Sequence, residues 1–174
     1  MNHDSYDDDL IAGVLHSVRT IAMVGASANN VRPSYFVLTY LVAKGFTVYP
    51  INPGRTGGEI AGRPCFASLA DVPEPIDMVD VFRAADAIPG VVDETLALIP
   101  LPKVIWLQLG IRNDEAAARA EAAGITVIQN RCPKIEYGRL SGEISWAGVN
   151  SRRVSARRPN LMGGFQHLKI RKPD

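Results

Sequence analysis

The organisation of this chain follows from residues 21–34, which read IAMVGASANNVRPS. A short apolar run stops at Gly25, which is typical of a buried strand that ends in a tight turn. Small residues follow, and a helix then starts near Pro33, a residue favoured in the first helical turn. A helix start offers unpaired backbone N–H groups and the positive end of a dipole. Residues 21–34 therefore predict a phosphate-binding turn, to which Arg32 adds a positive charge.

The bulk composition is typical of a soluble globular chain. The 174 residues carry a formal net charge of +1, which excludes a strong general attraction to nucleic acid or membranes. Two cysteines are too few for a disulfide framework. The acidic start is unlike a secretion signal, and no apolar run approaches the ~18 residues of a membrane helix. We expect a cytoplasmic protein with no membrane or nucleic-acid partner.

Five apolar runs separated by helical patterns predict alternating strands and helices. The expected strands are residues 20–24, 46–51, 76–82, 103–107 and 125–129. The expected helices are residues 5–18, 33–44, 89–99, the segment from an Asn113 cap to Gly124, and a last one ending near Leu140. The alternation predicts a single Rossmann-like, doubly wound α/β domain: a parallel sheet of about five strands with helices on both faces. Counting strands along the chain, we expect the order 3-2-1-4-5.

The chain divides into a main domain, residues 1–140, and a basic C-terminal arm, residues 141–174. The main domain includes the N-terminal helix. No acid occurs between Ile144 and Pro173, whereas arginine and lysine recur there. We predict an extended or partly ordered arm. It is either a solvated tail or a contact to a second subunit or partner protein, and a nucleic-acid contact is the least favoured alternative.

Arginines recur at the edge where a ligand is expected. Parallel α/β sheets bind ligands at the carboxyl ends of their strands, beside the point where the strand order reverses. Each of the five loops predicted at that edge carries one arginine: Arg32, Arg55, Arg83, Arg112 and Arg131. This pattern favours a polyanionic ligand lying across the edge. The plain alternative is that arginine is a common loop residue.

The glycine turn differs from the dinucleotide fingerprint. Residues 25–30 read GASANN, so Ser27 and Asn30 stand where the second and third glycines belong. An NAD site also needs an acid at the end of the second strand, and the next acid after that strand is Glu59. NAD is therefore disfavoured. NADP stays open, because Arg55 can contact a 2′-phosphate.

Four short motifs follow one another along the chain. They are GAS with RPS at residues 25–27 and 32–34, YPINP at 49–53, VFR at 81–83 and NRCP at 130–133. Together they resemble the small stand-alone CoA-binding proteins, whose fold is similar to the N-terminal domain of the succinyl-CoA synthetase α subunit. The resemblance covers about residues 10–140.

The resemblance implies a coenzyme A site at the sheet edge, without catalysis by this chain alone. The synthetases use a phosphorylated histidine in a second domain, whereas the histidines here, at positions 3, 16 and 167, lie outside the predicted site loops. We expect binding of CoA or an acyl-CoA, with Arg55 on the 3′-phosphate. The alternatives are an NADP-dependent oxidoreductase and a nucleotide-responsive redox sensor. The candidate binding residues are Gly25, Ala26, Ser27, Arg32, Pro33, Asn52, Pro53, Arg55, Phe82, Arg83, Ala84, Gly110, Asn130 and Cys132.

Several other residues have both a reactive and a structural interpretation. Cys132, at a predicted helix start, can have a lowered pKa and form a mixed disulfide with the CoA thiol, or can simply line the ligand. Cys65 is expected to be a packed thiol. Tyr40 and Lys44 have the spacing of short-chain reductases, but they lie in the first crossover helix and are interpreted as packing. His16 has no metal partner, so neither a catalytic residue nor a metal site is predicted.

Overall fold

Five parallel strands form one sheet at the centre of the protein. The computed structural model describes residues 1–143 and residue 170. The strands are β1 (Thr20–Val24), β2 (Thr47–Ile51), β5 (Met78–Val81), β6 (Val104–Leu107) and β7 (Thr126–Ile128). Each lies inside an apolar run, because a strand covered on both faces needs apolar side chains on both. The predicted Rossmann-like α/β fold is confirmed.

The strand order differs from the predicted one. The order is β2-β1-β5-β6-β7, which is 2-1-3-4-5 when the five parallel strands are counted along the chain, so the expected 3-2-1-4-5 is wrong. The third parallel strand, β5, pairs with β1 on the side opposite β2. Its place beside β2 is occupied by Phe66, whose backbone bridges to Ile51. The Phe66 N–H donates to Pro50 O at 3.0 Å, and its carbonyl accepts from Asn52 N at 2.9 Å.

A small hairpin delivers Phe66 to that edge. The hairpin consists of β3 (Glu59–Ile60) and β4 (Arg63–Pro64), which pair antiparallel. Its two turn residues, Ala61 and Gly62, both have positive φ, the geometry of a tight hairpin turn. From the sequence we predict no strand between residues 51 and 76, because each strand of the hairpin is only two residues long.

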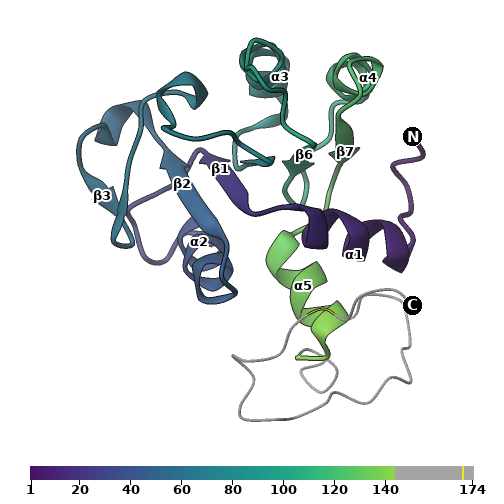
Figure 1. Ribbon diagram of the computed structural model, residues 1–174, viewed down its shortest axis with the longest axis horizontal. Coiled ribbons are helices and arrows are strands. Elements are labelled where there is room, and N and C mark those ends of the chain that lie inside the picture. Colours follow the sequence, from purple (N-terminus) through teal and green to yellow (C-terminus); the bar gives the residue numbers. More distant parts are fainter. Residues whose placement is uncertain (144–169, 171–174) are drawn as a thin grey trace.

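Helices cover both faces of the sheet (Figure 1). On one face lie α1 (Asp8–Ser17), α2 (Pro33–Ala43) and α5 (Pro133–Ser141). On the other lie α3 (Ile88–Leu96) and α4 (Asp114–Ala122). Two apolar cores result, one on each side, with Trp106 fully buried in the first and Leu107 in the second. Short 3-10 turns occur at Pro53–Arg55, Leu69–Asp71 and Ala85–Ala87. Within residues 1–143, no helix is long and apolar enough to span a membrane.

The predicted basic arm lies mostly outside the described residues. Ile170 is its one described residue beyond position 143, and its side chain joins the core beneath α1 and α5. The carbonyl of Ile170 lies 3.0 Å from Nε2 of His16, whose Nδ1 lies 2.7 Å from Ala12 O. His16 is therefore engaged by backbone groups of the fold.

The start of α4 is capped as the sequence predicts. The Asn113 side chain accepts a hydrogen bond from Ala116 N at 3.0 Å, and its backbone N–H donates to Gln129 Oε1 at 2.7 Å. The helix ends before Gly124, which has a φ of 89°. Asn113 thus joins α4 to the loop after β7.

Loss of the Asn113 cap should lower the stability of the protein. We expect Asn113→Ala to reduce the free energy of unfolding by about 1 kcal/mol, because the Ala116 N–H loses its acceptor. Asn113→Asp keeps an acceptor oxygen and should stay closer to the wild type. Urea unfolding followed by circular dichroism measures both variants. Equal stability of Asn113→Ala and the wild type would contradict the role of the cap.

Candidate functional site

Three loops begin side by side at the carboxyl edge of the sheet. The Gly25 N–H, after β1, donates to Ile51 O at the end of β2, at 3.1 Å. On the other side of β1, Phe82 N–H donates to Val24 O at 2.8 Å. The strand order reverses at β1, so the loops after β2, β1 and β5 meet at the switch point where ligands of such sheets bind.

Gly25 is required by a close backbone contact. It has a φ of 83°, in the left-handed region, and a Cβ atom there would lie 3.0 Å from Phe82 O and 3.1 Å from Arg83 Cδ. No larger residue fits without moving the loop after β5. This contact explains why the first glycine of the turn is present although the other two glycines of the dinucleotide fingerprint are not.

The turn after Gly25 is held by its own polar side chains. Ser34 Oγ accepts from Ser27 N at 3.1 Å, and Ser27 Oγ accepts from Asn29 N at 3.1 Å. Asn52 Nδ2 donates to Ala26 O at 2.8 Å, which joins the loop after β2 to the turn. No side chain caps the start of α2, so its dipole end remains open toward the turn.

The five edge arginines separate into two groups. Arg32, Arg55 and Arg83 are exposed, and their side chains make no hydrogen bond or ion pair with any other described residue. Arg112 is bound by Asp4 at 2.6 Å and by Asp114 at 2.8 Å. Arg131 Nη1 donates to Asn130 O at 2.8 Å, and its guanidinium lies over the ring of Tyr6. The three arginines without a partner in residues 1–143 are those of the switch-point loops.

The loops after β6 and β7 are bound to each other. The Gly110 N–H donates to Asn130 Oδ1 at 2.8 Å, and Trp106 Nε1 donates to Arg131 O at 2.9 Å. Asn130 has a φ of 53°, a conformation that asparagine tolerates. Gly110 and Asn130 therefore form a second part of the edge. The other predicted binding residues lie in the three switch-point loops and the α2 start, except Cys132.

Cys132 is not the activated thiol that its position suggested. It stands at the start of α5 as predicted, but its side chain is buried in the core. Burial raises the pKa of the Cys132 thiol, and this effect outweighs the lowering by the backbone N–H groups of Ile135 and Lys134. The expectation of a lowered pKa is wrong. Cys65 is buried too, as a packed thiol should be.

Sequence reasoning missed Asp80, a fully buried carboxylate in the middle of β5. It lies two residues before Phe82, directly beneath the switch-point loop. Gln108 Nε2 donates to Asp80 Oδ1 at 2.7 Å, whereas Oδ2 has no partner among the described residues. Burial raises the pKa of Asp80 to about 7. The signal was visible, since Asp80 is an acid inside the apolar run of residues 78–82.

Tyr40 and Lys44 have a structural partner. The Tyr40 hydroxyl donates to Glu143 Oε2 at 2.7 Å, and Lys44 forms an ion pair with the same carboxylate. The Tyr40 ring packs edge-to-face against Tyr137. Burial, together with the hydrogen bond to Glu143, raises the pKa of Tyr40. This geometry supports the interpretation of the pair as packing.

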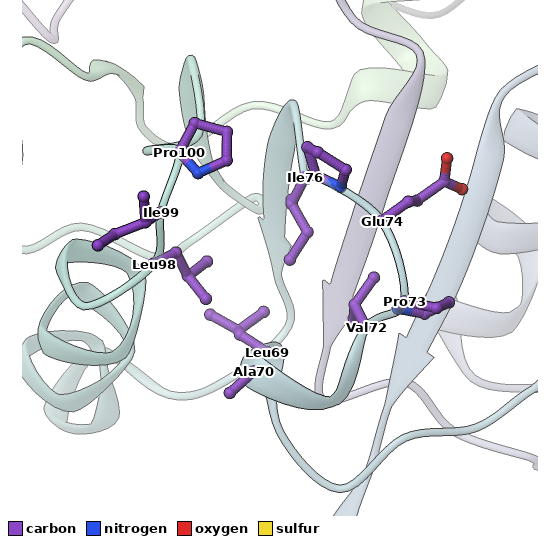
Figure 2. A pocket seen from close by; sticks show the side chains of 10 residues that line it. Leu69, Ala70, Val72, Pro73, Glu74, Ile76, Leu98, Ile99 and Pro100 are labelled. Carbon is purple, nitrogen blue, oxygen red and sulfur yellow. The ribbon is translucent and has the colours of Figure 1, made fainter.

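The hollow seen in Figure 2 lies at the opposite edge of the sheet. It measures about 270 Å³, and its lining includes Leu69, Ile76 and Pro100. Ile76 and Pro100 precede β5 and β6, so this hollow is at the amino ends of the strands. It is therefore separate from the switch-point loops. No group of three or more metal-ligating side chains occurs in the described part of the chain.

Fold and edge together define a Rossmann-like domain with a glycine turn and an open helix start at the switch point of its sheet. Residues 19–138 match the CoA binding domain family. The chain belongs to that family, which confirms the resemblance found in the sequence motifs.

Relatives occur both as small proteins and as parts of large ones. The protein YneT of Bacillus subtilis is 35% identical over 127 residues, which cover 73% of this chain and 91% of YneT. A solved structure from Thermus thermophilus is 39% identical with a TM-score of 0.72, covering 77% of this chain and 98% of that one. The ADP-forming acetate–CoA ligase II of Archaeoglobus fulgidus is 30% identical over 78 residues, 44% of this chain but 11% of the ligase.

The buried carboxyl of Asp80 should make stability depend on pH. Its folded pKa is raised, so the folded state holds a proton that the unfolded chain releases near pH 4, and this stabilisation is lost as pH rises toward 7. Asp80→Asn removes the titration and keeps an oxygen for Gln108. The free energy of unfolding of the variant, relative to that of the wild type, should therefore rise between pH 4 and 7 by up to about 4 kcal/mol. Each pKa unit corresponds to about 1.4 kcal/mol.

Denaturant unfolding of both proteins at several pH values from 4 to 8 measures this difference. Asp77→Asn is the matched control, because Lys103 and two backbone N–H groups lower the pKa of Asp77. The stability that Asp77 contributes is lost only as pH falls below about 4, so the difference between Asp77→Asn and the wild type should stay nearly constant from pH 4 to 8. A constant difference between Asp80→Asn and the wild type over this range would mean that Asp80 does not titrate there.

Proposed function

We propose that this protein binds CoA or an acyl-CoA at the carboxyl edge of its sheet and catalyses no reaction by itself. The observation that carries the proposal is the position of Arg32, Arg55 and Arg83. They lie on three loops joined at the switch point, beside an uncapped helix start, and have no partner among the described residues. Membership of the CoA binding domain family supports the choice of ligand.

The charges of the site and the ligand correspond. CoA carries roughly four negative charges at neutral pH, two on its pyrophosphate and nearly two on its 3′-phosphate. In this proposal the pyrophosphate lies at the start of α2, where backbone N–H groups and the helix dipole favour an anion. The stem of Arg83 lies against Gly25, so its charge serves the same turn. Arg55, at the end of the 3-10 turn after β2, is then left for the 3′-phosphate.

The described histidines do not serve this edge. His3 lies beside Tyr6 and Glu121, and His16 contacts backbone carbonyls beneath α1. His167 lies outside the described residues. The proposal therefore assigns no reaction to this chain, and any chemistry on the bound thioester would belong to a partner.

Blocking the turn should weaken ligand binding. Ser27→Trp places a bulky ring in the turn and should weaken CoA binding at least tenfold, because the pyrophosphate can no longer approach the backbone. Isothermal titration with CoA, acetyl-CoA, NADP and NAD measures it. Ala118→Trp, on the exposed side of α4, is the matched control and should bind CoA as the wild type does. Unchanged CoA affinity in folded Ser27→Trp, or tighter binding of NADP than CoA, would reject the proposal.

Arg55 should bind the 3′-phosphate of CoA. Arg55→Ala removes a charge-assisted contact of about 1.5–3 kcal/mol, so CoA should bind one to two powers of ten more weakly. Dephospho-CoA lacks this phosphate and should bind both proteins alike. Arg112→Ala is a suitable control at the same edge, because Asp4 and Asp114 already hold that guanidinium. Calorimetric titration of CoA and dephospho-CoA into each protein at fixed ionic strength measures these affinities. Equal weakening of both ligands by Arg55→Ala would show that Arg55 does not contact the 3′-phosphate.

A further inference from the structure

A groove of about 360 Å³ lies between α2 and α5. This volume is within the range of small-molecule sites, roughly 300–1,000 Å³. Its walls include Phe36, Thr39 and Tyr40 from α2 and Lys134 from α5. The far end contains Glu143, bound to Tyr40 and Lys44. The function proposed above makes no use of this groove.

The groove opens at the edge where CoA is proposed to bind. Phe36 lies in the first turn of α2, directly after the glycine turn, and Lys134 lies in the first turn of α5, directly after the loop that follows β7. Helices that follow parallel strands start at the carboxyl edge of the sheet. From Phe36 to Lys44 the groove follows α2 for about 12 Å, at 1.5 Å per residue. A CoA with its pyrophosphate at the α2 start can direct its thioester end into this groove.

The lining suits a short acyl chain. Phe36 is 50% exposed, and its ring and that of Tyr40 line the same hollow. Aromatic faces of this kind pack against methylene groups. The groove therefore offers apolar contacts next to the proposed phosphate site.

Lys134 lies at the mouth of the groove and has no acidic partner among the described residues. The Nζ atom of Lys134 lies 6.0 Å from the centre of the Phe36 ring and 5.6 Å from that of Tyr40. Lys134 makes no ion pair within the described residues. The acid of the groove, Glu143, is bound to Lys44 and Tyr40, and the acid two residues after Lys134 on α5, Glu136, is bound by Arg139.

We propose that the groove between α2 and α5 holds the acyl group of a CoA thioester, and that Lys134 selects short acyl chains that end in a carboxylate. The inference rests on the proposed function, CoA binding at the sheet edge. The aromatic side chains contact the methylenes, and the ammonium group at the mouth pairs with the terminal carboxylate. A short chain is required, because the ammonium group lies only 5.6 to 6.0 Å from the centres of the two rings that the methylenes contact.

Succinyl-CoA and butyryl-CoA form the test pair, since a carboxylate in one replaces a methyl group in the other. Full-length protein is titrated with each and with free CoA in a calorimeter. We expect succinyl-CoA to bind about five- to tenfold more tightly than butyryl-CoA. Lys134→Gln should remove this preference. Lys103→Gln, the same charge change at the amino edge where Lys103 pairs with Asp77, should keep it.

A second variant tests the groove itself. Thr39→Trp fills it from an exposed position on α2, so both acyl-CoAs should then bind no better than free CoA. If free CoA binds but the wild type shows no preference for succinyl-CoA, or if Lys134→Gln keeps one, the inference is overturned while the proposed function stands. Acyl-CoA binding unaffected by Thr39→Trp also overturns it. If free CoA does not bind at all, both are overturned.

Discussion

The contact between Gly25 and the backbone of Phe82 determines the geometry of the carboxyl edge around β1. A Cβ atom at Gly25 would lie 3.0 Å from Phe82 O, so the loop after β5 packs directly on the turn after β1. The hydrogen bond from Gly25 N to Ile51 O joins the end of β2 to the same point. Three separate loops thereby become one surface, and their arginines lie beside the start of α2.

The polar groups of this edge form two sets. One set is bound by other residues of the fold, and the other is exposed. Arg112 and Arg131 are held by residues near the N-terminus, by Asp4 and by the ring of Tyr6. Gly110 and Asn130 join the loops after β6 and β7. These contacts stabilise one half of the edge, whereas the arginines of the half around β1 have no partner among residues 1–143. The same residue type thus has two roles, and the neighbours of each arginine decide which.

The sequence was sufficient for features that depend on local patterns. The five strands, the Asn113 cap and the glycine turn all follow from apolar runs and from residues with specific backbone preferences. In the observed strand order Phe66 takes the place beside β2, a contact across fifteen residues with no local signature. The thiol pKa of Cys132 likewise depends on what covers the side chain, and a pattern of neighbouring residues does not show burial.

Asp80 and Lys134 show a second limit of prediction from the sequence. Both residue types were visible, but their meaning depends on partners that come from distant segments: Gln108 for Asp80, and Phe36 and Tyr40 for Lys134. Counting the charged residues of the edge loops identifies only the charges that lie in those loops. It does not find a carboxyl inside a strand or a cation beside a groove between two helices.

The position of Phe66 also protects the sheet from other molecules. An edge strand with free N–H and C=O groups invites pairing with a second chain, and that pairing leads to aggregation. On the outer side of β2, Phe66 takes the carbonyl of Pro50 and the N–H of Asn52, and Pro50 itself has no N–H to offer. The strand next to the glycine turn therefore offers an incoming β-strand few free groups, and the sheet is blocked from growing on that side.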